Sequence, residues 1–495
     1  MMPLLRLDNP SLRLTHRPAG RGRRLAHRSG GRGLLRGLAT GLGFLAVGAL
    51  DMQPALAQSK RNPTIIRDAE IETLMRDYTR PIFKVAGLTQ QNIQVVLIGD
   101  DSFNAFVADG KRIFINTGTL KQSATPNEVI GVLAHETGHI AGGHLARMRQ
   151  QIENAQTAAI VGMLLAAGGM AAGVSTGSNI GGTAGAGAMT MPQEIVRRSL
   201  LAYQRSEEQA ADRSALSYLN ATKQSPAGML KTFERLQNDQ MFISQRIDPY
   251  AISHPMAAER IAVLEDLAHK SPYFDVKDPP ELQARHDMMR AKLVGYTQTP
   301  DGVARIYGPQ GNTLPARYAR AISAYRYGNI NDAIRQIDAL IAEQPRNPYF
   351  YEIKGQAYLE AGRGRDAIGP LRRAVELSDG NPLIRMLLGQ ALIATNDKSL
   401  MDEAVRELNF GLQREPSSPI GWRYLAMAYG QRGDYPNADL ASAQSALLSG
   451  EYRLARELAT RAKTKFPLGS PGWLKADDIL NFKPPQEAMR RKPTP

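Results

Sequence analysis

The sequence predicts a mainly α-helical protein in two parts: a helical domain with a small β-sheet, followed by a solenoid of stacked helical pairs. Three observations support this prediction. Apolar residues recur at helical spacing over most of the chain beyond residue 65. Two short runs that contain aromatic and aliphatic residues flank an Asp-Gly turn, which indicates a β-hairpin. Small residues and an Asn-Pro pair recur at a spacing of 34 residues in the C-terminal part, which is the period of tetratricopeptide repeats.

Composition and charge exclude several classes of protein. The 495 residues are 43% hydrophobic and 22% charged, which is ordinary for a globular chain and argues against disorder and against a polytopic membrane protein. No cysteine occurs, so disulfides, iron–sulfur clusters and thiolate zinc sites are excluded, and a metal would need His and carboxylate ligands. Residues 1–57 supply +7 of the net charge of +14, and no nucleic-acid recognition motif accompanies the rest. We therefore expect no nucleic-acid partner.

Residues 1–57 have the order of a secretory signal. Nine arginines come first, an uncharged and largely apolar run follows at 37–50, and Ala55-Leu56-Ala57 forms a small-x-small cleavage pattern. The apolar run is shorter than the ~20 residues that a membrane-spanning helix needs, so a retained anchor is the weaker alternative. We expect export to the periplasm, with cleavage near Ala57 and a mature chain that begins at residue 58.

We place the first domain at residues 58–270. Its expected elements are a helix, a strand, a hairpin of two strands and three further helices, at 65–84, 93–98, 103–107 with 112–116, 127–148, 192–219 and 227–238. The hairpin turns at Asp109-Gly110. If strand 112–116 lies at a sheet edge, its unpaired N–H and C=O groups can bind an extended peptide as an added strand.

Segment 157–188 interrupts the helical pattern of the first domain. Residues 157–174 are uncharged, which meets the length threshold for a membrane span, but they contain four glycines and continue into a Gly- and Ala-rich stretch. We expect this segment to form a mobile lid or to contact a membrane peripherally. A buried helical hairpin with a flexible tip is the open alternative.

The C-terminal half is predicted as a repeat array at 316–480, reached through a linker with a short bridging helix at 271–315 and followed by a tail at 481–495. Gly355 and Gly389, for example, lie 34 residues apart, because small residues recur where paired helices approach closely. Four to five units would form a curved array that binds a peptide or protein partner on its concave face. The alternative is an array that only packs against the first domain.

The strongest motif is His135-Glu136-Thr137-Gly138-His139, an H-E-x-x-H pattern inside a predicted helix. Residues four apart project from the same face one turn apart, so both imidazoles can bind a single ion. Because thiolates are lacking, Zn²⁺ is the expected metal. A bound zinc ion lowers the pKa of water toward about 7, and Glu136 can take the proton and return it to a leaving amine.

A catalytic zinc needs a third protein ligand and one open position. Glu208 and Asp212 share a face of a second predicted helix, so one carboxylate can bind the metal while the other accepts a hydrogen bond from a ligand histidine or caps the first helix. Glu208 is the favoured ligand. Glu207 is the fallback if the helical register is off by one residue. His144 would lie about 180° round the helix from His135 if that helix continues, so we predict a surface or packing role for it.

These residues resemble the signature of a known family. H-E-x-x-H followed by E-x-x-A-D at Glu208 is similar to the pattern of the M48 zinc peptidases, relatives of the CAAX prenyl protease. Segments 104–106, 113–118 and 253–261 resemble the other motifs of that family. With an export signal and a repeat array, the chain resembles the periplasmic β-barrel assembly-enhancing protease subgroup. The resemblance implies a zincin-type α+β metalloprotease domain in front of the tetratricopeptide α-solenoid.

The resemblance also implies roles for the site residues. One zinc ion per chain would be bound by His135, His139 and Glu208, with Glu136 as the catalytic base and Asp212 as the acid that supports a ligand.

For two residues of segment 253–261, the resemblance implies alternative roles. His254 would approach the zinc and restrain activity, or contact substrate, and a structural loop histidine is its alternative. Arg260 would bind substrate or brace the loop. The several membrane spans of the inner-membrane relatives are missing, so catalysis within the bilayer is not expected.

The resemblance finally implies a function. We expect a periplasmic zinc-dependent endopeptidase that degrades misfolded or stalled outer-membrane proteins, supports their assembly and also acts as a chaperone. The repeat array would hold the unfolded substrate or the β-barrel assembly machinery. Two alternatives stay open: a scaffold or chaperone with a latent protease domain, and a broad secreted degradative metalloprotease.

Overall fold

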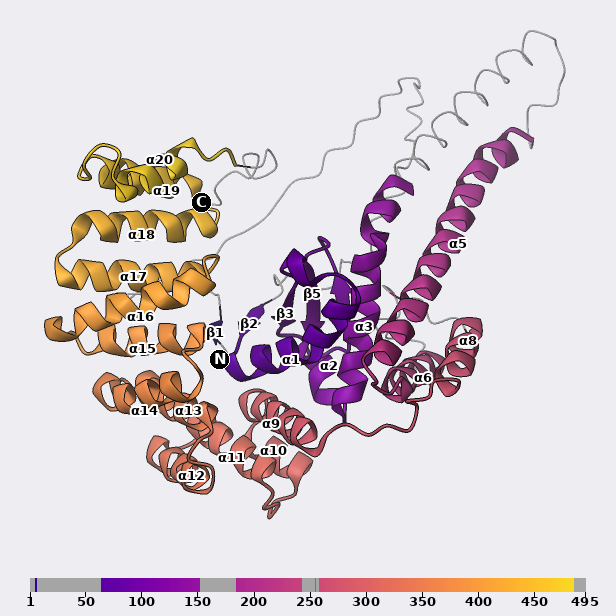
Figure 1. Ribbon diagram of the computed structural model, residues 1–495, viewed down its shortest axis with the longest axis horizontal. Helices are drawn as coiled ribbons and strands as arrows, with labels where there is room; N and C mark the ends of the chain where they lie inside the picture. Colours follow the sequence, from indigo (N-terminus) through magenta and orange to yellow (C-terminus); the bar gives the residue numbers. More distant parts are fainter. Residues whose placement is uncertain (1–4, 7–63, 152–183, 243–253, 255–257, 485–495) are drawn as a thin grey trace, which may run out of the picture. The chain divides into compact units, whose positions relative to one another are not determined.

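The computed structural model describes residues 5–6, 64–151, 184–242, 254 and 258–484 (Figure 1). The predicted signal at 1–57, apart from residues 5–6, and most of segment 157–188 lie outside this described part. Among the helices that are described, none is both long and apolar enough to span a membrane.

A five-stranded sheet forms part of the first domain, in the order β1-β2-β3-β5-β4. The strands are Leu5–Arg6 (β1), Ile65–Arg67 (β2), Gln94–Ile98 (β3), Ala105–Val107 (β4) and Arg112–Asn116 (β5). β3 and β5 run parallel, whereas the other neighbouring strands are antiparallel. The sheet is therefore mixed, with β3 and β5 at its centre.

The predicted hairpin is confirmed, and its position in the sheet corrects one expectation. β4 and β5 pair antiparallel, with Phe106 opposite Phe114. Gly110 has a φ of +75°, which the turn requires, and the Asp109 carboxylate accepts a hydrogen bond from the Arg112 N–H at 3.0 Å. Because β5 pairs with β3 on its other side, strand 112–116 does not lie at a sheet edge. The strand of the hairpin that lies at a sheet edge is β4.

Six helices of the first domain share a hydrophobic core with this sheet in the described part of the chain, and the first three contact its strands directly. They are Ala69–Val85 (α1), Thr117–Gln122 (α2), Pro126–Gly142 (α3), Ala184–Ala221 (α5), Ala227–Phe242 (α6) and Ala258–His269 (α8). α1 begins after Asp68, whose carboxylate accepts a hydrogen bond from the Ile71 N–H at 2.9 Å. Fully buried side chains such as Leu97 on the sheet, Val132 on α3 and Phe233 on α6 share one core.

α3 packs unusually closely against α5 and α6 because of two glycines. A Cβ added at Gly131 would lie 2.6 Å from the Met229 Cβ on α6, and one added at Gly138 would lie 2.9 Å from the Ala211 carbonyl oxygen on α5. Neither space can hold a side chain, so both glycines are required for this approach.

The helix predicted at 127–148 is in fact interrupted. α3 ends at Gly142, and Gly143 has a φ of +66°, with its N–H bonded to the carbonyl oxygens of His139 and Ile140. This left-handed residue is a common way to end a helix. Helical structure resumes at residue 144 in a new direction, so the prediction of one continuous helix is wrong (Figure 1).

Segment 271–315 contains two helices, Pro280–Thr297 (α9) and Pro300–Tyr307 (α10). α9 contacts α1, α2 and α11, and its residues Met289 and Leu293 are fully buried. This segment therefore contributes to the hydrophobic core in addition to connecting the two halves of the chain.

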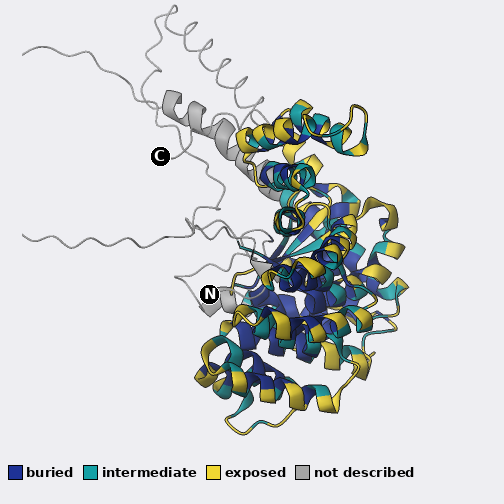
Figure 2. Cartoon of the chain, turned by 90° about the vertical axis from the view of Figure 1, so that its left-hand side faces the viewer, coloured by how far each residue is buried: buried dark blue, intermediate teal, exposed yellow. Residues whose placement is uncertain are grey.

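The C-terminal half consists of successive helices that pack in pairs (Figure 1). Their bounds are Leu314–Tyr327 (α11), Ile330–Glu343 (α12), Pro348–Glu360 (α13), Gly364–Leu377 (α14), Pro382–Ala394 (α15), Met401–Arg414 (α16), Pro419–Arg432 (α17), Tyr435–Leu448 (α18), Tyr452–Lys463 (α19) and Pro471–Asn481 (α20). Buried residues line the faces where helices meet, and exposed residues cover the outer faces (Figure 2).

The 34-residue period has a direct packing cause. A Cβ added at Gly355 would overlap with the Leu371 side chain of the paired helix, and one added at Gly389 would overlap with Leu408. The leucines lie 37 residues apart because a 3₁₀ turn at Lys398–Leu400 is inserted between them. The predicted fold class, mainly α with a small sheet and a helical repeat region, is confirmed.

Candidate metal centre

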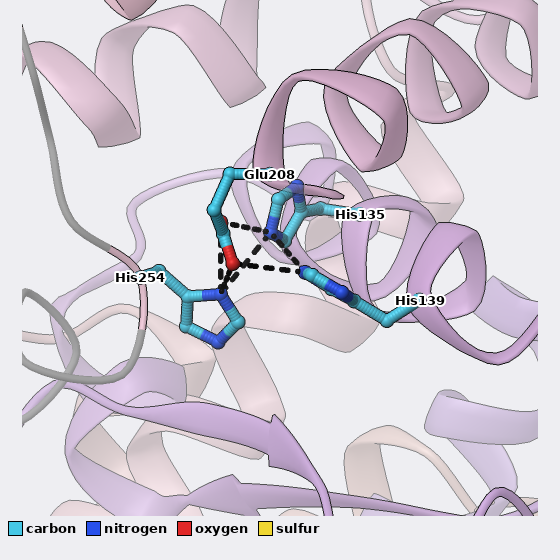
Figure 3. Close-up of side chains that lie close together, drawn as sticks. All are labelled: His135, His139, Glu208 and His254. Atoms are coloured by element: carbon cyan, nitrogen blue, oxygen red, sulfur yellow. Dashed lines mark hydrogen bonds and ion pairs between the residues drawn. The ribbon is translucent and has the colours of Figure 1, made fainter. Parts of the chain in front are cut away.

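Four candidate metal ligands converge between α3, α5 and the chain just before α8 (Figure 3). They are His135 and His139 on α3, Glu208 on α5, and His254, and one ligand atom of each lies within 4.8 Å of the others. Three of them were predicted as ligands, and His254 was predicted as a residue that approaches the metal.

The glycine at position 138 explains how the two helices bring these groups together. Gly138 lies between the two histidines in sequence, and a Cβ added there would lie only 2.9 Å from the Ala211 carbonyl oxygen. Ala211 in turn lies between Glu208 and Asp212. The close contact between α3 and α5 therefore places the carboxylates of Glu208 and Asp212 beside the imidazoles.

His135 is fully buried, and polar side chains lie close to both of its ring nitrogens. Its Nδ1 lies 2.9 Å from Asp212 Oδ1, whereas its Nε2 lies 3.1 Å from His139 Nε2 and 3.4 Å from Glu208 Oε2. Burial lowers the pKa of His135, but the hydrogen bonds with Asp212 and Glu208 raise it overall to about 9. An Nδ1–H directed at Asp212 leaves the Nε2 lone pair for a metal.

Arg260 binds both carboxylates of α5. Its Nε and Nη2 donate to Asp212 at 2.5 and 2.8 Å, and its Nη1 lies 2.9 Å from Glu208 Oε2. Burial raises the pKa of Asp212, but the Arg260 charge and hydrogen bonds hold it below its usual value. Arg260 is 4% exposed and lies over the Phe233 ring, so its contacts agree with a bracing role.

Glu136 lies beside the four ligands and is fully buried. Neither of its carboxylate oxygens has a hydrogen-bond partner among the described residues, and His254 Nε2 lies 3.4 Å from Oε1. Buried carboxylates are normally hydrogen-bonded. This orphaned carboxylate and a His–Glu donor set therefore fit a metal with its activated water.

His254 occupies the position of a fourth donor. Its Nδ1 lies 3.1 Å from Glu208 Oε2 and 3.3 Å from His135 Nε2, and the residue is 5% exposed. The structure thus places it among the candidate metal ligands and in reach of Glu136.

His144 is buried, so of its two predicted roles packing is the one that agrees, whereas its predicted position on the opposite side of the helix from His135 is wrong. It is 5% exposed, and its Nδ1 lies 2.9 Å from His139 Nδ1. Burial, followed by the nearby His139, lowers the pKa of His144 to about 4. The prediction failed because it extended α3 past Gly143, although the pair Gly142-Gly143 is itself a helix-stop signal.

Glu207, the fallback ligand, faces away from the cluster. Its Oε2 lies 3.0 Å from His144 Nε2 and binds the Arg147 guanidinium. Burial raises the pKa of Glu207, but the Arg147 hydrogen bonds lower it overall.

Histidines one helical turn apart, a carboxylate from a second helix and a buried orphan glutamate define a metallopeptidase centre. Comparison with known families agrees. Residues 66–268 match the model of peptidase family M48, and residues 318–382 match a tetratricopeptide repeat model. The chain therefore carries an M48 peptidase domain together with tetratricopeptide repeats, and it is a metallopeptidase. The resemblance predicted from the motifs is confirmed.

Curated relatives extend the similarity over both parts of the chain. A β-barrel assembly-enhancing protease of Yersinia pestis is 23% identical over 384 residues, which cover 76% of this chain and 75% of the relative. The protein of the same name from Escherichia coli O157:H7 is 25% identical over 387 residues, with 76% and 75% coverage. A solved structure described as MamA MSR-1 C2 is 20% identical and covers 33% of this chain and 93% of its own, with a TM-score of 0.29.

Proposed function

We propose that this chain is a zinc-dependent endopeptidase that acts on outer-membrane proteins in the periplasm. The observation that carries the proposal is the convergence of four ligand atoms within 4.8 Å beside an orphaned, buried Glu136. Without thiolates, this nitrogen and oxygen donor set favours zinc.

The residues of the site have distinct tasks in peptide hydrolysis. His135, His139 and Glu208 would hold the metal. When bound, zinc polarises a peptide carbonyl and lowers the pKa of water. Glu136 accepts the proton of the attacking water and delivers it to the leaving amine, and its lack of other partners suits this role. Asp212, fixed by Arg260, keeps the proton of His135 on Nδ1.

We further propose that His254 keeps the site latent. A catalytic zinc site leaves one position open for water, and four protein donors leave none in a tetrahedral site. His254 contacts Glu208, His135 and Glu136 at 3.1–3.4 Å, so it competes for the space that water and substrate need. Activity would begin when His254 withdraws.

The edge strand β4 offers a substrate platform. Among the described residues, β4 pairs only with β5, so its outer side can accept an extended peptide as an added strand. Such binding depends on backbone more than on side chains. It therefore suits unfolded or misassembled proteins, whose chains are extended and accessible.

The repeat array provides a groove for a protein partner. This groove has a volume of about 480 Å³ and lies on α16, α17, α18 and α20, where its lining includes Trp422, Tyr429, Asn409 and Asn437. Aromatic rings with amide side chains suit a peptide, because they contact apolar side chains and bind backbone groups. We propose that it holds the substrate or a component of the β-barrel assembly machinery.

The names of the relatives support a role in outer-membrane protein assembly. We propose that the chain is exported by its signal segment, degrades misfolded or stalled outer-membrane proteins and also supports their assembly as a chaperone. Contact of segment 157–188 with a membrane stays a prediction. Cell fractionation would distinguish a periplasmic quality-control protease from a secreted degradative one.

The Glu136→Gln variant tests catalysis separately from scaffolding. It keeps the shape of the side chain and the metal ligands but cannot take up the proton, so we expect unchanged zinc content and loss of cleavage of an unfolded outer-membrane protein. Full cleavage by this variant would contradict the proposed mechanism. If the inactive variant fully complements a deletion strain, the chain acts mainly as a scaffold with a latent protease domain.

A further inference from the structure

Each imidazole proposed above as a zinc ligand has a chain of close polar contacts leading away from the metal. For His135 the chain is a single contact, because its Nδ1 lies 2.9 Å from Asp212 Oδ1. For His139 it passes through a second imidazole: His139 Nδ1 lies 2.9 Å from His144 Nδ1, and His144 Nε2 lies 3.0 Å from Glu207.

The second chain allows only one arrangement of protons. The Glu207 carboxylate, bound to Arg147, only accepts hydrogen bonds, so His144 Nε2 must donate. In a neutral ring, His144 Nδ1 is then an acceptor, and His139 Nδ1 must donate to it. The remaining nitrogen, His139 Nε2, keeps its lone pair and lies 3.4 Å from Glu208 Oε1, inside the ligand cluster.

We propose that His144, held by Glu207, is a positioning residue that fixes the tautomer and the orientation of His139 for metal binding. The inference rests on the metal centre proposed above. It assigns a task to a histidine that lies outside H-E-x-x-H and to a glutamate that is not itself a ligand.

The backbone around His144 is shaped to place its ring there. Gly143 turns the chain at the end of α3, which brings the next residue back against the last turn of the helix. A Cβ added at Gly142 would overlap with His144 Nε2 and Cδ2. Gly142 therefore supplies the space for the ring, and both glycines serve the same placement.

Metal affinity tests the proposal without measuring catalysis. Zinc affinity of the full-length chain is measured by competition with a chromophoric chelator, and the geometry of the site is followed by the visible spectrum of the Co²⁺ form. We expect His144→Leu to weaken zinc binding by about 10–100-fold and to change the Co²⁺ spectrum. His144→Asn restores a hydrogen-bond acceptor near the position of Nδ1 but provides no donor to Glu207. Its zinc affinity should therefore lie between those of the parent and of His144→Leu.

His286→Leu is the matched control. His286, on α9, is also fully buried, but it binds the Tyr78 hydroxyl and the Ser123 carbonyl oxygen. We expect it to lower thermal stability and to leave zinc affinity unchanged within about twofold. Parental zinc affinity and Co²⁺ spectrum in His144→Leu would overturn the proposal. A parent chain that binds no zinc would instead overturn the metal centre.

A double-mutant cycle tests the role of Gly142. Gly142→Ala alone should lower zinc affinity about as much as His144→Ala, because the new methyl group displaces the ring. In a chain that already carries His144→Ala, Gly142→Ala should lower zinc affinity little further, because no imidazole ring is left to displace. Additive losses would show that Gly142 does not act through His144. If His144→Leu fails to fold, His144→Asn and Gly142→Ala carry the test.

Discussion

Lys292 lies at the centre of a buried group of charges that joins α9 to α1 and α13. Its side chain is 1% exposed, and Nζ lies 2.8 Å from Asp68, 3.3 Å from Glu70 and 3.2 Å from Glu352. Three buried carboxylates thus share one ammonium group. Burial outweighs the attraction of Lys292 and raises the pKa of Glu352 from 4.5 to about 7.

The Glu352→Gln variant removes this titration and keeps the size of the side chain. A carboxyl group whose pKa is raised on folding binds more protons in the folded than in the unfolded chain. The parent therefore loses stability as the pH rises from about 4.5 through about 7. One pKa unit corresponds to ~1.4 kcal/mol. As the pH rises from 5 to 8, we therefore expect the free energy of unfolding of the variant to increase by roughly 2–3 kcal/mol relative to that of the parent.

Hydrogen exchange with mass spectrometry is the suitable assay, because peptides of α9 and α13 report the opening free energy where the charges lie. Tryptophan fluorescence would report other helices, since Trp422 and Trp473 belong to α17 and α20. Glu343→Gln on α12 is the control, because the Glu343 side chain is 46% exposed. A gain for Glu352→Gln that stays constant from pH 5 to pH 8 would refute the reasoning.

Three further predictions concern the metal centre and the repeat array. Zinc must displace the proton of His135, because the pKa of this residue is raised to about 9. Zinc affinity measured by chelator competition should therefore rise about tenfold per pH unit from pH 6.5 to 8.5. A zinc affinity that does not change over this pH range would contradict the prediction. His254→Ala should keep zinc and increase cleavage of an unfolded protein several-fold in a fluorescent peptide-release assay; unchanged cleavage would argue against latency. The valine of Gly389→Val would overlap with Leu408, so this variant should lower the free energy of unfolding of the array by about 1–3 kcal/mol. Urea titrations followed by tryptophan fluorescence measure this loss. Gly369→Val is the control, because a Cβ at position 369 meets no atom within 4 Å, and its stability should not change.

Local periodicity was sufficient to predict the parts of the site that depend on one helix. His135 and His139 share a face because they lie four residues apart, and the same spacing relates Glu208 to Asp212. The Asp-Gly turn likewise predicted the hairpin, since its backbone conformation is a local property. The pairing of the two helices followed from the chemistry of zinc, which needs a third ligand, and from the family resemblance.

The contacts that the sequence did not predict depend on where the chain changes direction or on pairing between segments far apart in the sequence. His144 was misplaced because the helix was extended through Gly143, and a single left-handed residue changes the direction of everything after it. The neighbours of β5 depend on a parallel pairing with β3 that no local pattern contains. Lys292 looked like an ordinary charged residue, and only its three acidic neighbours from distant segments explain its burial.

The geometry gives α5 a larger share in the metal centre than its single ligand suggests. Glu208 contacts the ligand cluster, Asp212 holds His135, and Glu207 holds His144 and through it His139. Each histidine of α3 is thus oriented by a carboxylate of the same neighbouring helix. The register of α5 on α3 therefore determines metal ligation and imidazole orientation together. That register depends on the contact at Gly138, where no side chain separates the two backbones.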